Sequence, residues 1–136
     1  MRRYVSILTL RTHSRNQMAK ILLAEDDDSM RQFLKRALER AGHKVTAVDR
    51  GDVAVPLIAG GGYDLLLTDI VMPEMDGIEL ARRAGKLAPK MRIMFITGFA
   101  AVALNKKGPG PAEAKVLSKP FHLKDLVAEV DRALVA

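Results

Sequence analysis

The sequence predicts an α/β domain built on one parallel β-sheet of five strands with helices on both faces. Short apolar runs of strand length alternate with segments whose apolar residues recur at helical spacing. The apolar runs are nearly continuous, which is typical of parallel strands that are buried on both faces. Strands that alternate with helices in this way form a single sheet whose connections run through the covering helices.

Length and composition are consistent with one soluble domain. A chain of 136 residues with 49% hydrophobic residues can bury a real core. Cysteine is absent, which excludes disulfides and thiol chemistry and fits the reducing cytoplasm, where we expect the protein to reside. The apolar runs are far shorter than the ~20 residues needed to span a bilayer, so no membrane association is expected.

Most of the excess positive charge lies in the first 17 residues. The net charge is +6, and four arginines but no acidic residue precede Met18. The remainder is only mildly basic, which argues against a nucleic-acid-binding surface. We expect residues 1–17 to be a disordered basic arm or an extension from an upstream start, and residues 18–136 to form the domain.

The five expected strands are short and differ in polarity. They comprise residues 21–24, 44–48, the run that begins at Leu65 and ends at Asp69, 93–96 and 115–118. The second of these is the most polar, which favours an edge position. A central strand would instead be apolar on both faces.

The helices between the strands carry their own start and stop signals. The expected helices run from the acidic segment to Ala41, then over about 52–59, 76–85, 99–104 and 123–134. Asp28 or Ser29 is expected to cap the first, and Asp76 with Glu79 is expected to form a reciprocal cap on the third. Pro56 lies inside the second helix, where it removes a backbone hydrogen bond.

The segment around Asp69 is the most informative part of the chain. A buried strand ends there and becomes a loop that contains Pro73 and Gly77. Asp69 therefore lies at the carboxyl edge of the sheet, where ligands bind in open parallel sheets. Taken alone, an aspartate after a strand is usually only a turn former.

Polar residues follow the ends of four strands and should meet at this edge. They are Glu25, Asp26, Asp69, Thr97 and Lys119. Carboxylates that share a cleft repel one another unless a cation lies between them, and oxygen ligands with spare positions for water suit Mg²⁺. A lysine and a hydroxyl nearby can neutralise and hydrogen-bond a phosphoryl group. The pattern predicts a site that transfers phosphate to a carboxylate.

Other classes of site fit the residues less well. A dehalogenase-type phosphatase needs a second aspartate at the position of Val71. A calcium loop starting at Asp26 and Asp28 lacks its glycine and its distal glutamate. A DNA-binding regulator needs an output domain, and none is predicted after the fifth helix. The three histidines (His13, His43 and His122) are isolated and indicate neither a phosphodonor nor a metal site.

From Lys20 onward the chain resembles the receiver domains of two-component response regulators, the CheY-like family. The matching residues are Glu25-Asp26, Asp69 within Thr-Asp-Ile-Val-Met-Pro-Glu-Met-Asp-Gly, Thr97, and Lys119-Pro120-Phe121. The resemblance implies a flavodoxin-like (βα)5 fold with strand order 2-1-3-4-5. It also implies a phosphoacceptor signalling domain, which is no enzyme beyond its own phosphorylation and dephosphorylation.

The resemblance also implies roles for individual residues. Asp69 would take a phosphoryl group from a histidine kinase or a histidine phosphotransferase. Mg²⁺ would be held by Glu25, Asp26, Asp69 and the backbone carbonyl of Val71. The Lys119 ammonium and the Thr97 hydroxyl would contact the phosphoryl oxygens.

A closer likeness extends over two segments, Ile96–Asn105 and Lys115–Leu123. They are similar to a single-domain branch of the family, whose members act, when unphosphorylated, as adaptors for the ClpXP protease. The likeness implies output through protein contacts rather than DNA. The alternative is a stand-alone CheY-like regulator, or a phosphorelay intermediate, that acts on another protein target. Val116 stands where CheY carries its switching tyrosine, so an aromatic switch cannot operate at that position.

Overall fold

The computed structural model describes residues 18–97, 115–118 and 122–135. Its centre is a parallel sheet of five strands in the order β3-β2-β4-β5-β6. The strands are β2 (Lys20–Ala24), β3 (Lys44–Val48), β4 (Leu65–Asp69), β5 (Arg92–Thr97) and β6 (Lys115–Ser118). Counted along the chain this order is 2-1-3-4-5, which confirms the predicted fold and the edge position of the second strand.

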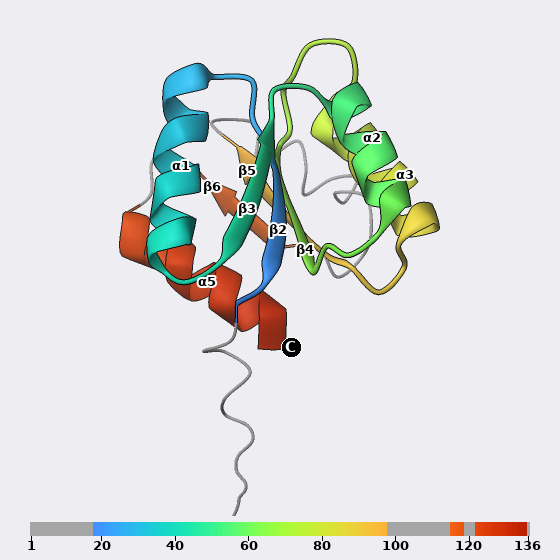
Figure 1. The fold of residues 1–136 in the computed structure, drawn as a ribbon. Coiled ribbons are helices and arrows are strands. Elements are labelled where there is room, and N and C mark those ends of the chain that lie inside the picture. The colour runs from blue at the N-terminus through green and yellow to red at the C-terminus, as the bar shows by residue number, and fades with distance from the viewer. Residues whose placement is uncertain (1–17, 98–114, 119–121, 136) are drawn as a thin grey trace, which may run out of the picture.

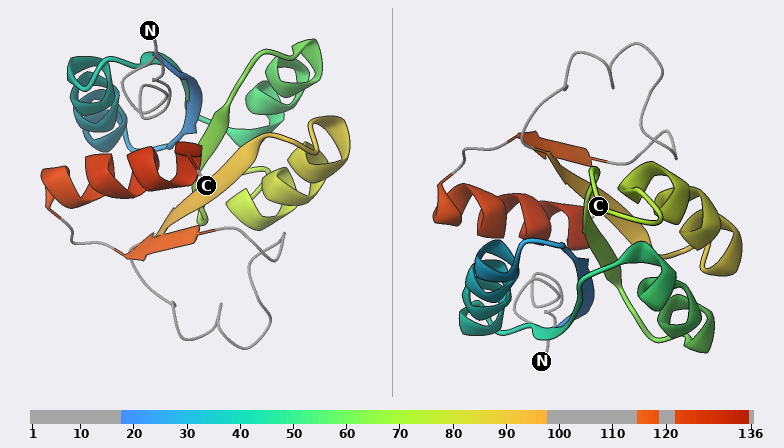
Figure 2. Two further views of the ribbon diagram at one scale, coloured as in Figure 1. Left: turned by 90° about the horizontal axis from the view of Figure 1, so that it is seen from below. Right: turned by 90° about the horizontal axis from the view of Figure 1, so that it is seen from above.

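Helices cover both faces of the sheet. They are α1 (Asp28–Arg40), α2 (Gly51–Gly60), α3 (Gly77–Leu87) and α5 (Leu123–Val135). Helices α1 and α5 lie on one face, and α2 and α3 lie side by side on the other (Figures 1 and 2). Within the described segments, no helix is long and apolar enough to cross a membrane. The basic arm and the short helix expected at 99–104 lie outside the described residues.

Strand side chains divide between two cores by simple alternation. In β2, Ile21 and Leu23 pack under α1 and α5, while Leu22 and Ala24 pack under α2 and α3. Strands β4 and β5 alternate in the same way, and their buried side chains are almost all apolar. Burial on both faces explains the continuous apolar runs in the sequence.

The residue that caps the start of α1 differs from the prediction, and the end of the helix matches it. The cap is Asp27, whose carboxylate accepts the N–H of Met30 at 2.8 Å, rather than Asp28 or Ser29. The run of acidic residues offers several capping side chains, and Asp27 has the extended backbone of a capping residue, whereas Asp28 and Ser29 already lie within the helix. The helix gives way at Gly42, as expected, and its φ of +101° is one that glycine adopts readily.

Other elements are slightly longer than predicted. Helix α2 gains one residue at each end, α3 extends to Leu87, and β5 includes Arg92 and Thr97. Such shifts are usual, because end residues complete only part of the hydrogen-bond pattern.

The buried histidine has a structural role that the sequence did not indicate. His43 is only 6% exposed, and its Nδ1 accepts the N–H of Ala19 at 3.3 Å. The other ring nitrogen, Nε2, lies 3.3 Å from Asp131 Oδ1 on α5. His43 thus joins the start of β2 to the last helix. It contributes to no group of potential metal ligands in the described part of the chain.

Helix α2 keeps Pro56 in its interior, as predicted. Proline has no N–H, so the Asp52 carbonyl one turn earlier receives no hydrogen bond from position 56. Pro56 is exposed, so its ring adds nothing to the core under α2.

Replacing Pro56 by alanine should therefore stabilise the protein. Interior proline costs about 3 kcal/mol relative to alanine, and the stiffer unfolded chain returns up to about 1 kcal/mol. We expect Pro56→Ala to raise the free energy of unfolding by about 2 kcal/mol in urea titrations. Pro89→Ala, in the exposed loop after α3, is the control and should give no gain. A loss of stability in Pro56→Ala would contradict this account.

Candidate functional site

Three carboxylates meet at the carboxyl edge of the sheet. Glu25 and Asp26 follow β2, and Asp69 ends the neighbouring strand β4. The parallel register pairs Ala24 with Thr68, so the next residue of each strand reaches the same level. One carboxylate oxygen from each of the three side chains lies within 4.8 Å of the others. The structure thus brings together the three acidic residues that the sequence singled out.

Two of these carboxylates are buried and are supported by backbone donors. Glu25 is 1% exposed and Asp69 is 8% exposed, whereas Asp26 is exposed. The N–H of Asp27 donates to Glu25 Oε2 at 3.1 Å, and the N–H of Ile70 donates to Asp69 Oδ1 at 2.7 Å. Buried charge is costly unless such groups replace water. Glu25 and Asp69 are therefore held by backbone hydrogen bonds, and Asp26 is the member of the cluster that is exposed to solvent.

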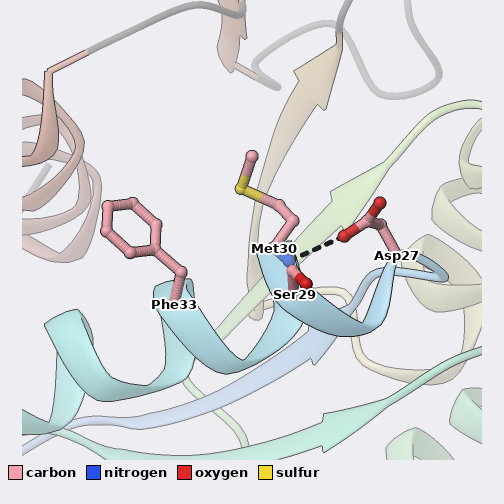
Figure 3. A pocket seen from close by; sticks show the side chains of 4 residues that line it. All are labelled: Asp27, Ser29, Met30 and Phe33. Carbon is pink, nitrogen blue, oxygen red and sulfur yellow. Dashed lines mark hydrogen bonds between the residues drawn. The ribbon is translucent and has the colours of Figure 1, made fainter.

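The loop between β2 and α1 is held from both ends. The N–H of Glu25 donates to the Val48 carbonyl at 3.1 Å, which continues the pairing with β3 beyond the strand. Asp27 then caps α1 (Figure 3). Beyond this cap, Met30 and Phe33 project from the same side of α1 and line a shallow pocket with Asp27 and Ser29.

The loop after Asp69 folds back tightly against the strand end. The hydroxyl of Thr68 donates to the Asp69 carbonyl at 2.8 Å, and the N–H of Gly77 donates to the Ile70 carbonyl at 2.8 Å. A Cβ at Gly77 would clash with the Asp69 carbonyl oxygen and lie 3.0 Å from Ile70 Cα. Position 77 therefore requires glycine if the loop is to keep Asp69 in place.

The expected cap of α3 forms on one side only. Asp76 accepts the N–H of Glu79 at 2.9 Å, as predicted. The reciprocal role of Glu79 was wrong, because its carboxylate contacts Arg82 and Arg83 at 2.6 and 3.0 Å. The hydrogen bond from Arg83, followed by that from Arg82, holds the pKa of Glu79 below its usual value. Arginines three and four residues on offered stronger partners than a backbone N–H.

The remaining predicted site residues are described only in part. Val71 lies two residues after Asp69 and is 57% exposed. Thr97 ends β5 next to Ser118 of β6, and only its backbone is described. Lys119 lies outside the described residues. The described donor set consists of hard carboxylate oxygens, which fits Mg²⁺.

Comparison with known proteins identifies the family. The response regulator receiver domain family matches residues 21–131. The chain belongs to this family. It is 61% identical over 119 residues to the response regulator receiver protein CpdR of Brucella abortus, and the match covers 88% of this chain and 99% of CpdR. The sequence-based recognition, including the likeness to a single-domain regulator, is thereby confirmed.

Two further relatives define the wider group. The sensor kinase CckA of Brucella abortus is 37% identical over 118 residues, which are 85% of this chain but only 12% of CckA. The crystal structure of a response regulator receiver protein from Sinorhizobium medicae superposes with a TM-score of 0.81 at 33% identity. That match covers 88% of this chain and 96% of the other. The receiver fold is therefore shared by regulators and by a part of a kinase.

Two residues that shape the site were not found from the sequence. Arg31 contacts the Glu25 carbonyl, and a contact to a main-chain oxygen six residues away leaves no side-chain pattern. From the sequence, Gly77 was assigned only to the loop after Asp69, whereas the structure shows a close approach of its Cα to the Asp69 backbone. Only the pairing of Arg31 with Asp28, at helical spacing, had a visible signal.

A methyl group at position 77 should disturb both the fold and the cluster. Gly77→Ala is expected to lower the free energy of unfolding by about 1–3 kcal/mol, because backbone atoms of Asp69 must move. Gly60→Ala is the matched control, since a Cβ there meets nothing within 4 Å. Urea titration measures both variants. Equal stability of Gly77→Ala and the wild-type protein would show that the loop gives way easily.

Proposed function

We propose that this response regulator accepts a phosphoryl group on Asp69 from the phosphohistidine of a histidine kinase or a histidine phosphotransferase. The observation that carries the proposal is the position of Asp69. Its largely buried carboxylate lies beside Glu25 and Asp26, at the sheet edge where ligands bind in this fold. Membership of the receiver family supports the same role.

In the proposed reaction the protein forms a single covalent bond, through Asp69, and otherwise positions the reacting groups. A carboxylate oxygen of Asp69 forms a bond to phosphorus while the bond between phosphorus and the donor imidazole nitrogen breaks, and the imidazole leaves and takes up a proton. The N–H of Ile70 holds Asp69 Oδ1 at 2.7 Å, which orients the carboxylate for attack. Thr97 and Lys119 are proposed to contact the phosphoryl oxygens, on the strength of the family resemblance.

The acidic cluster is proposed to hold Mg²⁺ through Glu25, Asp26, Asp69 and the backbone carbonyl of Val71. When bound, Mg²⁺ neutralises charge on the carboxylates and on the phosphoryl oxygens. The Asp27 N–H donates to Glu25, and Asp26 is exposed to the solvent from which the ion would enter. Carboxylate oxygens and water are the usual ligands of this ion.

The output is proposed to be a change in protein contacts. Similarity to CpdR supports an adaptor that binds the ClpX subunit when unphosphorylated and releases it on phosphorylation. Residues 99–105, β6 and α5 are the proposed changing surface, since Thr97 lies just before residue 99 in the sequence and pairs with Ser118 of β6. A stand-alone CheY-like regulator, or a phosphorelay intermediate, remains the second candidate, which the likeness to CckA favours.

Removing the proposed nucleophile should abolish phosphorylation and leave the fold intact. With acetyl phosphate and Mg²⁺, intact-mass spectrometry should show one added phosphoryl group on the wild-type protein and none on Asp69→Asn. Asp125→Asn makes the same change on the exposed first turn of α5 and should behave as the wild type. A phosphorylated Asp69→Asn protein would contradict the assignment. So would loss of its cooperative melting, because the substitution keeps the side-chain volume.

The adaptor proposal makes a separate prediction about affinity. The free protein should bind the amino-terminal domain of ClpX at least about tenfold more tightly than the beryllofluoride-loaded protein, a difference of about 1.4 kcal/mol. Isothermal titration of both forms measures it. Equal affinities would exclude a phosphorylation switch at this surface. Absence of binding in both forms would exclude the adaptor role and favour the second candidate.

A further inference from the structure

Arg31, on the second turn of α1, reaches back over the loop that carries the acidic residues. Its Nη1 donates to the Glu25 carbonyl at 3.0 Å, and its Nη2 donates to Asp28 Oδ1. The Arg31 side chain is 17% exposed, so most of it is covered by the protein. One guanidinium therefore contacts both ends of the segment from Glu25 to Asp28.

The two contacts differ in strength. Asp28 is 86% exposed, and ion pairs with such a carboxylate are weakened by water and salt. The Glu25 carbonyl lies at a residue that is 1% exposed, where a hydrogen bond from a charged donor is stronger. The contact to Glu25 should therefore contribute most of the restraint on this segment, and Asp28 mainly orients the guanidinium group.

Asp26 lies between neighbours that are fixed. On one side, Glu25 is held through its N–H by Val48 and through its carbonyl by Arg31. On the other side, Asp27 is held through its N–H by Glu25 Oε2, and its carboxylate caps α1. Arg31 is a side chain of the helix that contacts the strand end across this loop.

We infer that Arg31 is a positioning residue, which holds the Glu25–Asp28 segment so that Asp26 stays beside Glu25 and Asp69. The inference rests on the proposed function, in which these carboxylates bind Mg²⁺. Groups that orient metal ligands typically change metal affinity 10- to 100-fold when they are removed.

The charge of Arg31 and its contacts to the loop have opposite effects on the affinity for Mg²⁺. A guanidinium close to the cluster repels a divalent cation, so removal of the charge alone would tighten Mg²⁺ binding. Loss of the contacts from Arg31 to Glu25 and Asp28 would let the carboxylate ligands move and would weaken Mg²⁺ binding. The sign of the change in affinity therefore separates the two effects.

Two variants of Arg31 and one control measure this sign. Arg31→Lys keeps the charge but loses the fork that reaches two acceptors, and Arg31→Met loses both. Mg²⁺ titrations at constant ionic strength should give weaker affinities in both variants, by about 10-fold in Arg31→Lys and by less in Arg31→Met, where loss of the charge partly offsets loss of the contacts. Arg36→Met changes the same charge at an exposed position of the same helix and should leave the affinity unaltered. Asp28→Ala should weaken binding less than either Arg31 variant.

Amide hydrogen exchange without Mg²⁺ gives a second readout. The N–H of Asp27, which is bonded to Glu25 Oε2, should exchange faster in Arg31→Lys and Arg31→Met than in the wild type. It should exchange at the wild-type rate in Arg36→Met. Cooperative melting of each variant shows whether the fold is retained.

The outcomes are distinguishable. Tighter Mg²⁺ binding in Arg31→Met, or wild-type affinity in both Arg31 variants, would overturn the positioning role while leaving the proposed function in place. If the wild-type protein bound no Mg²⁺, the proposed metal site would fail. Faster exchange of the Asp27 N–H in the Arg31 variants would then still show that Arg31 holds the Glu25–Asp28 segment. Unchanged exchange would overturn this role.

Discussion

The parallel register between β2 and β4 is the constraint on which the rest of the structure depends. It pairs Ala24 with Thr68, so both strands end at the same level. Ile21–Ala24 and Leu65–Leu67 are buried and apolar, and the acidic residues follow directly after these runs and Thr68. Glu25, Asp26 and Asp69 therefore gather at the one edge where the buried apolar runs of both strands end. The site follows from the packing of the sheet.

Gathering three carboxylates has a cost, and the structure offsets it locally. Glu25 and Asp69 are nearly inaccessible to water, and each accepts a backbone N–H from a residue close to it in the chain. Those N–H groups belong to loops whose conformations are fixed by other contacts, such as the Asp27 cap and the close approach of Gly77. The loops thus act as a rigid frame for charges that repel each other, a typical arrangement at functional sites that trade stability for activity.

Features set by repeating patterns were predictable from the sequence, and features set by single contacts were not. Alternation of strands and helices predicted the fold, and strand ends predicted that Glu25, Asp26 and Asp69 would meet. The cap of α1 was assigned to the wrong residue, since several adjacent acidic residues satisfy the same rule and only backbone geometry selects Asp27. Arg31 was missed because its main partner is a carbonyl, which every residue possesses.

The division of the interior into two cores has a consequence for synthesis of the protein. Leu34 and Leu38 of α1 are made early, yet their core also contains Leu126 and Val130 of α5. Among the described residues, the other core is built from α2, α3 and strands that precede α5, so it can close sooner. A nascent chain therefore exposes the leucines of α1 until α5 has left the ribosome. During that interval the part of the sheet that α5 later covers is open to chaperones and to other unfinished chains.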